Sequence, residues 1–380
     1  MSSDFPPYIS TQLHYLLNHF PDKLKIENVW SGSKHYSGTL DRFTLLIPYC
    51  LDTIKWDIIY NLEFPLAAPD VIFGPDDEDF HRFLMMRGEG DRDSRSRAEF
   101  AMSDWNNRDP TRLLALIKEL RDQYAAYQRW RAGEIDDDRL KFEISTIMSR
   151  EGIEMQIISG ADKTEEVKFG VPLMHVNINK MVSGCPWRHP QKIYLQVIYP
   201  VARKYASAPS APRLKLMSPP ELKALFSIDD VKLPSWLDGM CMAEYLPNLE
   251  ESLGKQVFEA VTLIDSRRSF IEALAPLFGR PLEADPVFCR KATFLATSGP
   301  FAFLVYFLLS TQFPKQQPVL MLQSTQHFQS QGVPIKSSLL SDYPWSPRWE
   351  VSLMAERIFD FLVDEALNFK RYCNESQLQH

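Results

Sequence analysis

A phenylalanine followed by two prolines four residues apart is the feature that most constrains this chain. The frame consists of Phe64, Pro65 and Pro69, and it directly follows an apolar segment. Each proline fixes φ and removes a backbone donor, so neither a helix nor a central strand can run through it. The chain must therefore leave its sheet at Phe64 as an extended, packed turn.

Strand candidates lie on both sides of this proline frame. Residues 43–48 and 54–62 have the β-branched and aromatic composition of half-buried strands. The five residues between them suit a hairpin. After the frame, the apolar run 71–73 can rejoin the sheet. An amphipathic helix at 9–20 and a strand at 24–30 are predicted to precede this hairpin.

The same order recurs near the other end of the chain. Phe313, Pro314 and Pro318 repeat the frame after a strand candidate at 301–310. Trp105 comes 36 residues after Pro69, and Trp349 comes 31 residues after Pro318. Each tryptophan precedes an amphipathic helix, predicted at about 111–127 and 351–369. Self-similarity at this scale indicates a repeated structural unit.

A third, degenerate copy is predicted between these two. Tyr199 and Pro200 follow strand candidates at 154–159, 167–178 and 192–198, and Trp236 precedes a further helical stretch. A proline-containing insertion, 206–212, interrupts the frame. A helix at 139–150 opens this copy. The predicted domains are therefore 1–130, 131–247 and 248–380, each an antiparallel meander packed with helices.

Two further segments carry specific expectations. The helix predicted at 249–278 contains Asp265 to Arg268, a polar run that could break it before the next strand, 287–297. Between 74 and 104, charged and small residues dominate, so a mobile surface loop is expected there. The acidic run Asp76 to Asp79 is interpreted as a solvated surface, with an acidic docking patch as the alternative.

Composition excludes several classes of function. The chain has 380 residues and a net charge of -7, so neither nucleic acid nor an anionic membrane is an expected partner. Its five cysteines are scattered and odd in number, which favours reduced thiols in an intracellular protein. The N-terminus lacks a signal-peptide pattern. The longest apolar run, 301–309, is half the length that a bilayer requires.

No motif for a cofactor or a metal is present. Cys185 and His189 are two zinc-capable side chains, but a structural site needs four ligands and no second pair lies nearby. Neither a G-x-S-x-G elbow nor a phosphate-binding glycine loop occurs. We therefore expect no cofactor and no metal.

A helix, a meander of strands, a proline turn and a tryptophan before the next helix resemble the ubiquitin-conjugating enzyme fold and its inactive UEV and RWD relatives. The whole chain is similar to the BRE family of UEV-domain subunits of the BRISC deubiquitinase and a related nuclear A-complex. The segments that carry this are DRF at 41–43, LIP at 46–48, KWDIIY at 55–60, IFG at 72–74 and YPWSPRW at 343–349. The resemblance implies an α+β fold of three consecutive UEV/RWD-like domains.

The resemblance also allows conjugating activity to be checked against the motif that such activity requires. Conjugating enzymes place a nucleophilic cysteine between the proline turn and the tryptophan, after a His-Pro-Asn motif. The intervals 73–105, 212–236 and 318–349 contain no cysteine, and His81 and His327 are not followed by proline. Because a thioester needs a thiolate, we expect no enzyme here. The histidine pair of a JAMM-type zinc deubiquitinase is also missing, so activity is expected in a partner subunit.

The resemblance implies that this chain is a non-catalytic scaffold subunit. The expected partners are a JAMM deubiquitinase catalytic subunit, its coiled-coil pseudoenzyme partner and a von Willebrand-A-like adaptor, with polyubiquitin as a further candidate. The assembly would cleave lysine-63-linked polyubiquitin in the cytoplasm and nucleus, in DNA damage repair, apoptosis and cytokine-receptor signalling. The alternative is a stand-alone UEV-type module that binds ubiquitin or a peptide. A weaker alternative is an unconventional conjugating enzyme that uses Cys185, Cys241 or Cys289.

Candidate site residues follow from the aromatic and proline pattern. We expect Tyr343, Trp345, Trp349 and Phe369 to contribute to partner binding, because UEV domains bind proline-containing peptides beside such a segment. Core packing is the alternative for the first three. Trp105 and Trp349 are each predicted to wedge the helix that follows them against the sheet. The six residues of the two proline frames are predicted to be turn architecture: Phe64, Pro65, Pro69, Phe313, Pro314 and Pro318.

Overall fold

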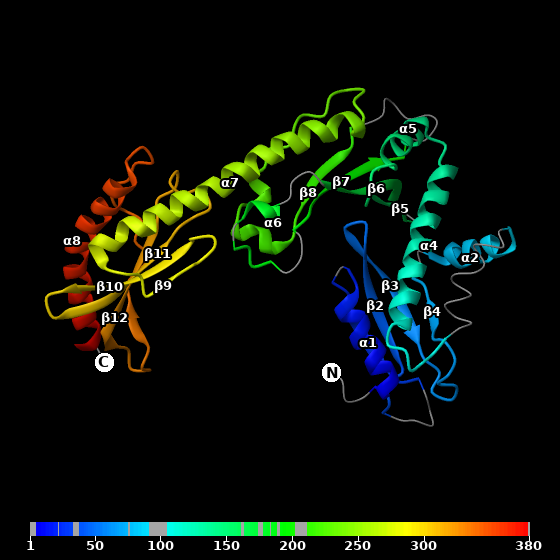
Figure 1. Ribbon diagram of the computed structural model, residues 1–380, viewed down its shortest axis with the longest axis horizontal. Coiled ribbons are helices and arrows are strands. Elements are labelled where there is room, and N and C mark those ends of the chain that lie inside the picture. The colour runs from blue at the N-terminus through cyan, green and yellow to red at the C-terminus, as the bar shows by residue number, and fades with distance from the viewer. Residues whose placement is uncertain are drawn as a thin grey trace. The chain divides into compact units, whose positions relative to one another are not determined.

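The computed structural model has a mixed α+β architecture (Figure 1). It contains three antiparallel sheets and, among the residues described, seven α-helices. The chain divides into two compact units. The first comprises Met1–Pro172, Tyr194–Met217 and Trp236–Glu244, and the second comprises Leu173–Ile193, Ser218–Ser235 and Tyr245–His380. The structure describes residues 5–21, 23–32, 38–74, 77–90, 105–160, 163–173, 178–182, 184–187, 191–201 and 211–378.

The first sheet confirms the predicted strands around the N-terminal proline frame. Its strands pair in the order β1 (Lys25–Trp30), β2 (Arg42–Tyr49), β3 (Asp52–Ile59) and β4 (Asp70–Ile72). Three helices pack with it: α1 (Pro7–His19), α2 (Glu78–Gly90) and α4 (Arg112–Glu134). α4 continues past the predicted end because Gln128 and Ala132 stay buried beyond residue 127.

Alternation along the strands builds one core between this sheet and its helices. Phe43, Leu45 and Ile47 of β2 are fully buried, as are Trp56 and Ile58 of β3. Strands expose alternate side chains on opposite faces, so these residues share the face toward the helices. The opposite face carries polar side chains and an open groove of about 710 Å³, which Thr44, Lys55 and Asp57 help to line.

Part of the expected mobile loop is instead helical, which corrects the prediction for 74–104. α2 forms because Phe80 and Phe83, one helical turn apart, pack against α4. Asp77 is also not a solvated residue, since it is 7% exposed and accepts a 2.8 Å hydrogen bond from the Tyr124 hydroxyl. Asp76 and residues 91–104 lie outside the described residues.

The turn between β2 and β3 has only two residues, Cys50 and Leu51. Both have positive φ, 48° and 62°, which matches the turn that best suits a two-residue hairpin. Such turns usually carry Asn-Gly, because side chains with a Cβ disfavour this conformation. The predicted hairpin is therefore confirmed, but its turn has two residues rather than the expected five, and neither is a typical turn former. Contacts outside the hairpin must hold them.

Those contacts come from the second sheet, which belongs to the same unit. Its strands pair in the order β5 (Glu154–Gly160), β6 (Lys163–Leu173), β7 (Ile193–Pro200) and β8 (Arg213–Met217). The Tyr49 hydroxyl donates to the Met155 carbonyl at 2.9 Å, and the Cys50 amide donates to Glu154 Oε2 at 2.5 Å. A Cβ on Gly170 would approach Leu51 Cγ to 3.2 Å, so the turn lies tightly against β6.

An ion pair reinforces this junction. Arg121 of α4 contacts the Glu154 carboxylate and also donates from Nε to the Pro48 carbonyl at 3.2 Å. One arginine thus ties the helix, the end of β2 and the start of β5 together. The first two sheets consequently share one continuous set of contacts within the first unit.

A buried glutamate of one helix binds the backbone at the start of another. α5 (Asp138–Ile147) carries Glu143, which is 1% exposed. Its carboxylate accepts the Met242 amide at 2.9 Å, at the first residue of α7 (Met242–Phe278). A carboxylate at a helix N-terminus satisfies a free N–H group and interacts favourably with the helix dipole. The strand predicted at 167–178 ends earlier, at Leu173, and Ile178 begins the short helix α6 (Ile178–Met181).

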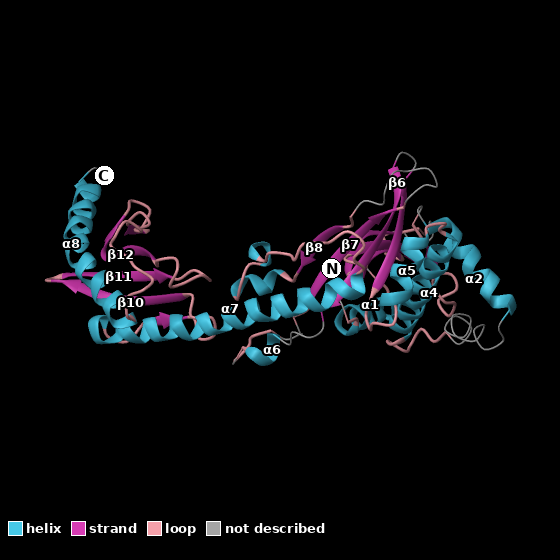
Figure 2. Cartoon of the chain, turned by 90° about the horizontal axis from the view of Figure 1, so that it is seen from above, coloured by secondary structure: helices cyan, strands magenta, loops and turns pink. Residues whose placement is uncertain are grey.

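The second unit is built on the third sheet, with strand order β13-β12-β11-β10-β9. The strands are β9 (Glu283–Ala284), β10 (Lys291–Ser298), β11 (Phe301–Leu308), β12 (Val319–Phe328) and β13 (Pro334–Lys336). Helix α8 (Val351–Leu378) extends beyond its predicted end at 369. The C-terminal end of α7 lies beside β10 in both views (Figures 1 and 2), where Phe278 contacts Phe294. Two 3₁₀ turns precede α7, at Pro220–Ala224 and Ile228–Asp230.

The break considered at Asp265 to Arg268 does not occur, because one of these residues is a core residue. Arg267 is 0% exposed, and its guanidinium donates to the carbonyls of Phe288 at 2.8 Å and Thr311 at 3.2 Å. Burial lowers its pKa to about 10. The strand expected at 287–297 starts at Lys291, and the short edge strands β9 and β13 were not predicted.

Candidate functional site

The C-terminal candidate residues fall into two groups by exposure. Tyr343 is buried, and its hydroxyl donates to the Pro318 carbonyl. Burial raises the pKa of this phenol. Phe369 of α8 is 2% exposed, with its ring 5.9 Å from that of Phe301. Trp345 and Trp349 are only partly buried. The two tryptophans are therefore partly open to solvent, whereas Tyr343 and Phe369 are core residues.

The C-terminal proline frame is covered by its own unit. Phe313 is 0% exposed, with its ring 5.0 Å from Phe270 of α7 and 5.8 Å from Trp345. The Trp345 indole Nε1 donates to the Pro314 carbonyl at 3.0 Å, and the Phe313-Pro314 peptide bond is cis. These contacts fit the predicted turn architecture. The Trp345 side chain that closes the turn is also partly open to solvent.

The outer face of α8 contributes residues that the sequence reasoning did not single out. Val363 and Leu367 are both 52% exposed and lie one helical turn apart. Asp360, Asp364 and Arg371 are exposed around them. The sequence could have indicated Val363 and Leu367, because both apolar residues lie outside the stripe of α8 that packs into the core. That stripe consists of Ile358, Leu362, Ala366 and Phe369.

The N-terminal proline frame differs from its counterpart. Phe64 is 65% exposed and Leu66 is 75% exposed, while Pro69 is buried. The Asn61 side chain accepts the amides of residues 63 and 64 at 2.9 and 3.3 Å, which fixes the entry to the turn. The Asn107 side chain donates to the Pro65 carbonyl at 3.1 Å. In both frames, a side chain from the segment before the next helix thus holds the first proline's carbonyl.

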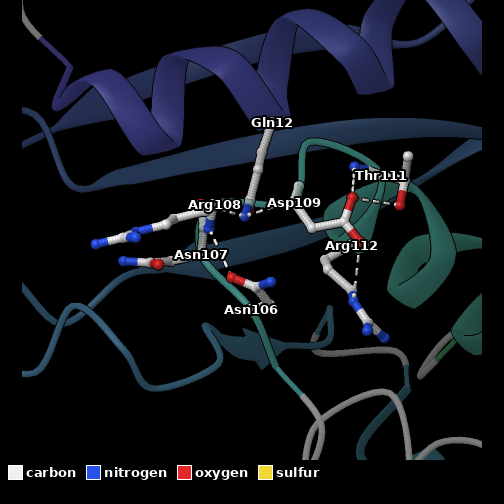
Figure 3. Close-up of polar contacts among 7 residues, drawn as sticks. All are labelled: Gln12, Asn106, Asn107, Arg108, Asp109, Thr111 and Arg112. Carbon is white, nitrogen blue, oxygen red and sulfur yellow. Dashed lines mark hydrogen bonds and ion pairs between the residues drawn. The ribbon is translucent and has the colours of Figure 1, made fainter.

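A buried glutamine anchors that segment (Figure 3). Gln12 of α1 is 0% exposed and donates to the carbonyls of Asn107 at 3.2 Å and Asp109 at 3.3 Å. Its Oε1 accepts the Tyr60 hydroxyl at 2.8 Å. Asp109 in turn accepts the Thr111 amide and hydroxyl, and these bonds lower the pKa of its carboxyl group. Trp105 is partly buried, with its ring 6.5 Å from that of Tyr60, consistent with the predicted wedge.

The cysteines do not form an obvious reactive centre. Cys50, Cys241, Cys289 and Cys373 are buried free thiols, and Cys185 is partly exposed. Burial raises the pKa of Cys50 to about 12 and that of Cys373 to about 11, so both stay protonated and unreactive at neutral pH. Within the described ranges, no three metal-ligating side chains converge, and no helix has the length and apolarity to cross a membrane.

Sequence comparison with known proteins identifies the family of this chain. The family model of brain and reproductive organ-expressed protein (BRE) matches residues 1–328. This chain belongs to the BRE family. A BRE-family relative from Danio rerio, "BRISC and BRCA1-A complex member 2", is 32% identical over 326 residues, which are 83% of this chain and 80% of the relative. A relative of the same name from Branchiostoma floridae is 26% identical over 358 residues, 92% and 89% of the two chains.

The names of the BRE-family relatives indicate which features of the structure concern function. The relatives are named as members of complexes, which draws attention to surfaces that a partner subunit can contact. Two such surfaces are now defined. The α8 surface comprises Val363 and Leu367, and the N-terminal loop surface comprises Phe64 and Leu66.

Proposed function

We propose that this chain is the non-catalytic scaffold subunit of a JAMM-type deubiquitinase complex that cleaves lysine-63-linked polyubiquitin. The observation that carries the proposal is the name shared by two relatives, "BRISC and BRCA1-A complex member 2". The scaffold would bridge the catalytic subunit and its coiled-coil pseudoenzyme partner to a von Willebrand-A-like adaptor. It would act in the cytoplasm and nucleus, in DNA damage repair, apoptosis and cytokine-receptor signalling.

We also propose that the chain consists of three UEV/RWD-like domains at 1–130, 131–247 and 248–380. The support is the repeated proline frame, in which Asn107 and Trp345 hold equivalent proline carbonyls. Catalytic inactivity is supported by the lack of a cysteine in 73–105, 212–236 and 318–349, and by the burial that raises the pKa of Cys289. The catalytic zinc would then belong to a partner subunit.

Purification of the tagged full-length chain from its native cells tests the proposal. The eluate should contain a JAMM protease and should cleave lysine-63-linked chains, and a zinc chelator should abolish the cleavage. The matched control is the same eluate with lysine-48-linked chains, which should stay intact. A monomeric eluate with no protease, or cleavage that resists the chelator, would contradict a scaffold of a metalloprotease.

The α8 surface is the proposed adaptor-binding site. Val363→Asp with Leu367→Asp should weaken adaptor capture about tenfold or more, because buried charge at an interface centre is strongly unfavourable. Leu339→Asp is the matched control, since Leu339 is 63% exposed in the same unit but lies outside α8. Quantitative pulldown with the purified adaptor measures the effect. Equal capture by both variants would place the adaptor elsewhere.

A ubiquitin-binding module remains the second candidate, and one observation favours it. One face of the third sheet carries a groove of about 710 Å³, in which the apolar side chains of Tyr306, Leu308 and Met321 lie beside the charged Glu283, Asp285 and Lys291. Such a face could accept an apolar patch of ubiquitin. NMR titration of labelled ubiquitin with the full chain separates the two candidates. Shifts abolished by Met321→Asp would favour the module, and unchanged spectra would favour the scaffold.

A further inference from the structure

One edge of the third sheet is covered only in part by its own short strand. β9 pairs with β10 at Ala292 and Thr293. At the end of this ladder the Leu282 amide donates to the Thr293 carbonyl at 2.8 Å. Pro281, the residue before Leu282, has no N–H with which to continue the pairing. From residue 294 onward, no described strand lies on the side of β10 away from β11.

The direction of the Thr293 carbonyl identifies the backbone groups that are left open. This carbonyl points toward β9, and backbone groups alternate in direction along a strand, so every second residue points the same way. Leu295 and Thr297 therefore direct their N–H and C=O groups outward, and no described residue forms a hydrogen bond with any of these four groups. Both residues are exposed, Leu295 at 45%. Donors and acceptors that repeat every two residues match the backbone of another extended chain.

The other described sheet edges have features that discourage an additional strand. β1 contains a bulge, β4 and β9 have only three and two residues, and the Gln128 side chain occupies an amide of β5. Arg213 and Lys215 lie on β8, and Pro334 begins β13. The open part of β10 has neither a charged residue nor a proline, and its register with β11 is continuous. It is therefore the described edge that is best suited to pairing.

Apolar side chains lie along this open edge. Leu295 is two residues from Thr293, so both lie on the same face of the sheet. Leu282 is 59% exposed and lines a groove on that face together with Thr293 and Tyr306. A strand added beside β10 would place every second side chain on this face, next to Leu295 and in line with Leu282. An apolar side chain there would remove both leucines from water, whereas a charged one would not.

We propose that residues 294–298 of β10 accept an extended, uncharged segment of a partner subunit as an additional strand of the third sheet. Main-chain hydrogen bonds to Leu295 and Thr297 hold this segment, and Leu282 and Leu295 select its apolar residue. A second copy of the chain fits less well, because a stable dimer uses about 20–30 residues a side and this edge offers two outward-pointing ones.

This contact goes beyond the proposed adaptor site, since it uses backbone groups of β10 and not the α8 surface. It depends on membership of a complex and not on the activity of that complex. A complex without a protease would therefore contradict the proposed function and leave the strand contact to be decided by its own measurement.

Hydrogen exchange resolved to single amides is that measurement, applied to the isolated full-length chain and to the complex purified through it. In the complex, the amides of Leu295 and Thr297 should exchange at least about tenfold more slowly, because both acquire acceptors. The amides of Phe294 and Ala296 face β11 in both samples and are the internal control. Equal exchange of Leu295 and Thr297 in the two samples would overturn the proposal. Slow exchange in the isolated chain, at low or high concentration, would also overturn it, because the chain or a second copy would then cover the edge.

A proline substitution distinguishes an added strand from a side-chain contact. Thr297→Pro removes an outward N–H that has no partner among the described residues, so the β10–β11 ladder keeps its hydrogen bonds. In the complex of this variant, the Leu295 amide should exchange within about twofold of its rate in the isolated variant, because the added strand is lost. Thr297→Val keeps the N–H and should preserve slow exchange. Slow exchange at Leu295 that persists in the Thr297→Pro complex would refute strand addition.

Discussion

Trp56→Ala should lower the free energy of unfolding of the first unit by about 3–5 kcal/mol. The indole is 0% exposed on β3, and its ring lies 5.4 Å from Phe73 and 6.2 Å from Tyr124. Its removal would leave a cavity between the sheet and two helices, which the close-packed surroundings can fill only in part. Hydrogen exchange at the amides of β2 and β3 measures the loss in this unit, without assuming that the whole chain unfolds in one step.

Two variants make the result interpretable. Trp130→Ala removes the same side chain from a 44% exposed position on α4 and should cost about 1 kcal/mol or less. Trp56→Phe keeps an aromatic ring and removes an indole N–H that has no partner among the described residues, so its loss should stay below about 1.5 kcal/mol. Similar losses for Trp56→Ala and Trp130→Ala would show that Trp56 is not central to the core.

Glu154→Ala should destabilise the junction between the first two sheets by about 2–3 kcal/mol. The substitution removes the acceptor of the Cys50 amide and the carboxylate that pairs with Arg121. Both partners are largely shielded from water, so each loses an interaction that solvent replaces poorly. Chemical denaturation of the full chain, followed by hydrogen exchange at β5, measures the effect.

An exposed ion pair on the first sheet provides the control. Glu27 contacts Lys55 at 2.7 Å, but the two side chains are 39% and 57% exposed, so Glu27→Ala should cost about 0–1 kcal/mol. In a double-mutant cycle, Arg121→Ala and Glu154→Ala should couple by about 1–3 kcal/mol. Strict additivity of those two substitutions would mean that the pair contributes no interaction of its own.

Much of the secondary structure could be predicted because local patterns determine it. The β-branched and aromatic composition of 43–48 and the apolar periodicity at 351–369 each favour one element whatever surrounds it. α2 was missed because the charged residues around it dominate the composition of 74–104. Phe80 and Phe83, three residues apart, were the overlooked signal of a buried helical face. The edge strands β9 and β13 have too few residues to carry any pattern.

The candidate site could be predicted only in part, for a different reason. The proline frames mark both turns, but nothing local to them distinguishes the buried Phe313 from the exposed Phe64. That difference depends on Phe270, which is 43 residues away in sequence and reaches Phe313 from α7. Similarly, Arg267 can be buried because carbonyls distant in sequence accept its hydrogen bonds. Its charge therefore suggests a helix break when only the local apolar periodicity is considered.

The turn at Cys50 and Leu51 has a consequence for how this family evolves. Its unusual residues are specified by the second sheet rather than by hairpin preferences, and Gly170 leaves just enough room for Leu51. Positions 51 and 170 should therefore covary among relatives, because a larger residue at one requires a smaller residue at the other. Chimeras that exchange the first sheet between two BRE-family proteins should tolerate the exchange only when position 170 is transferred with it.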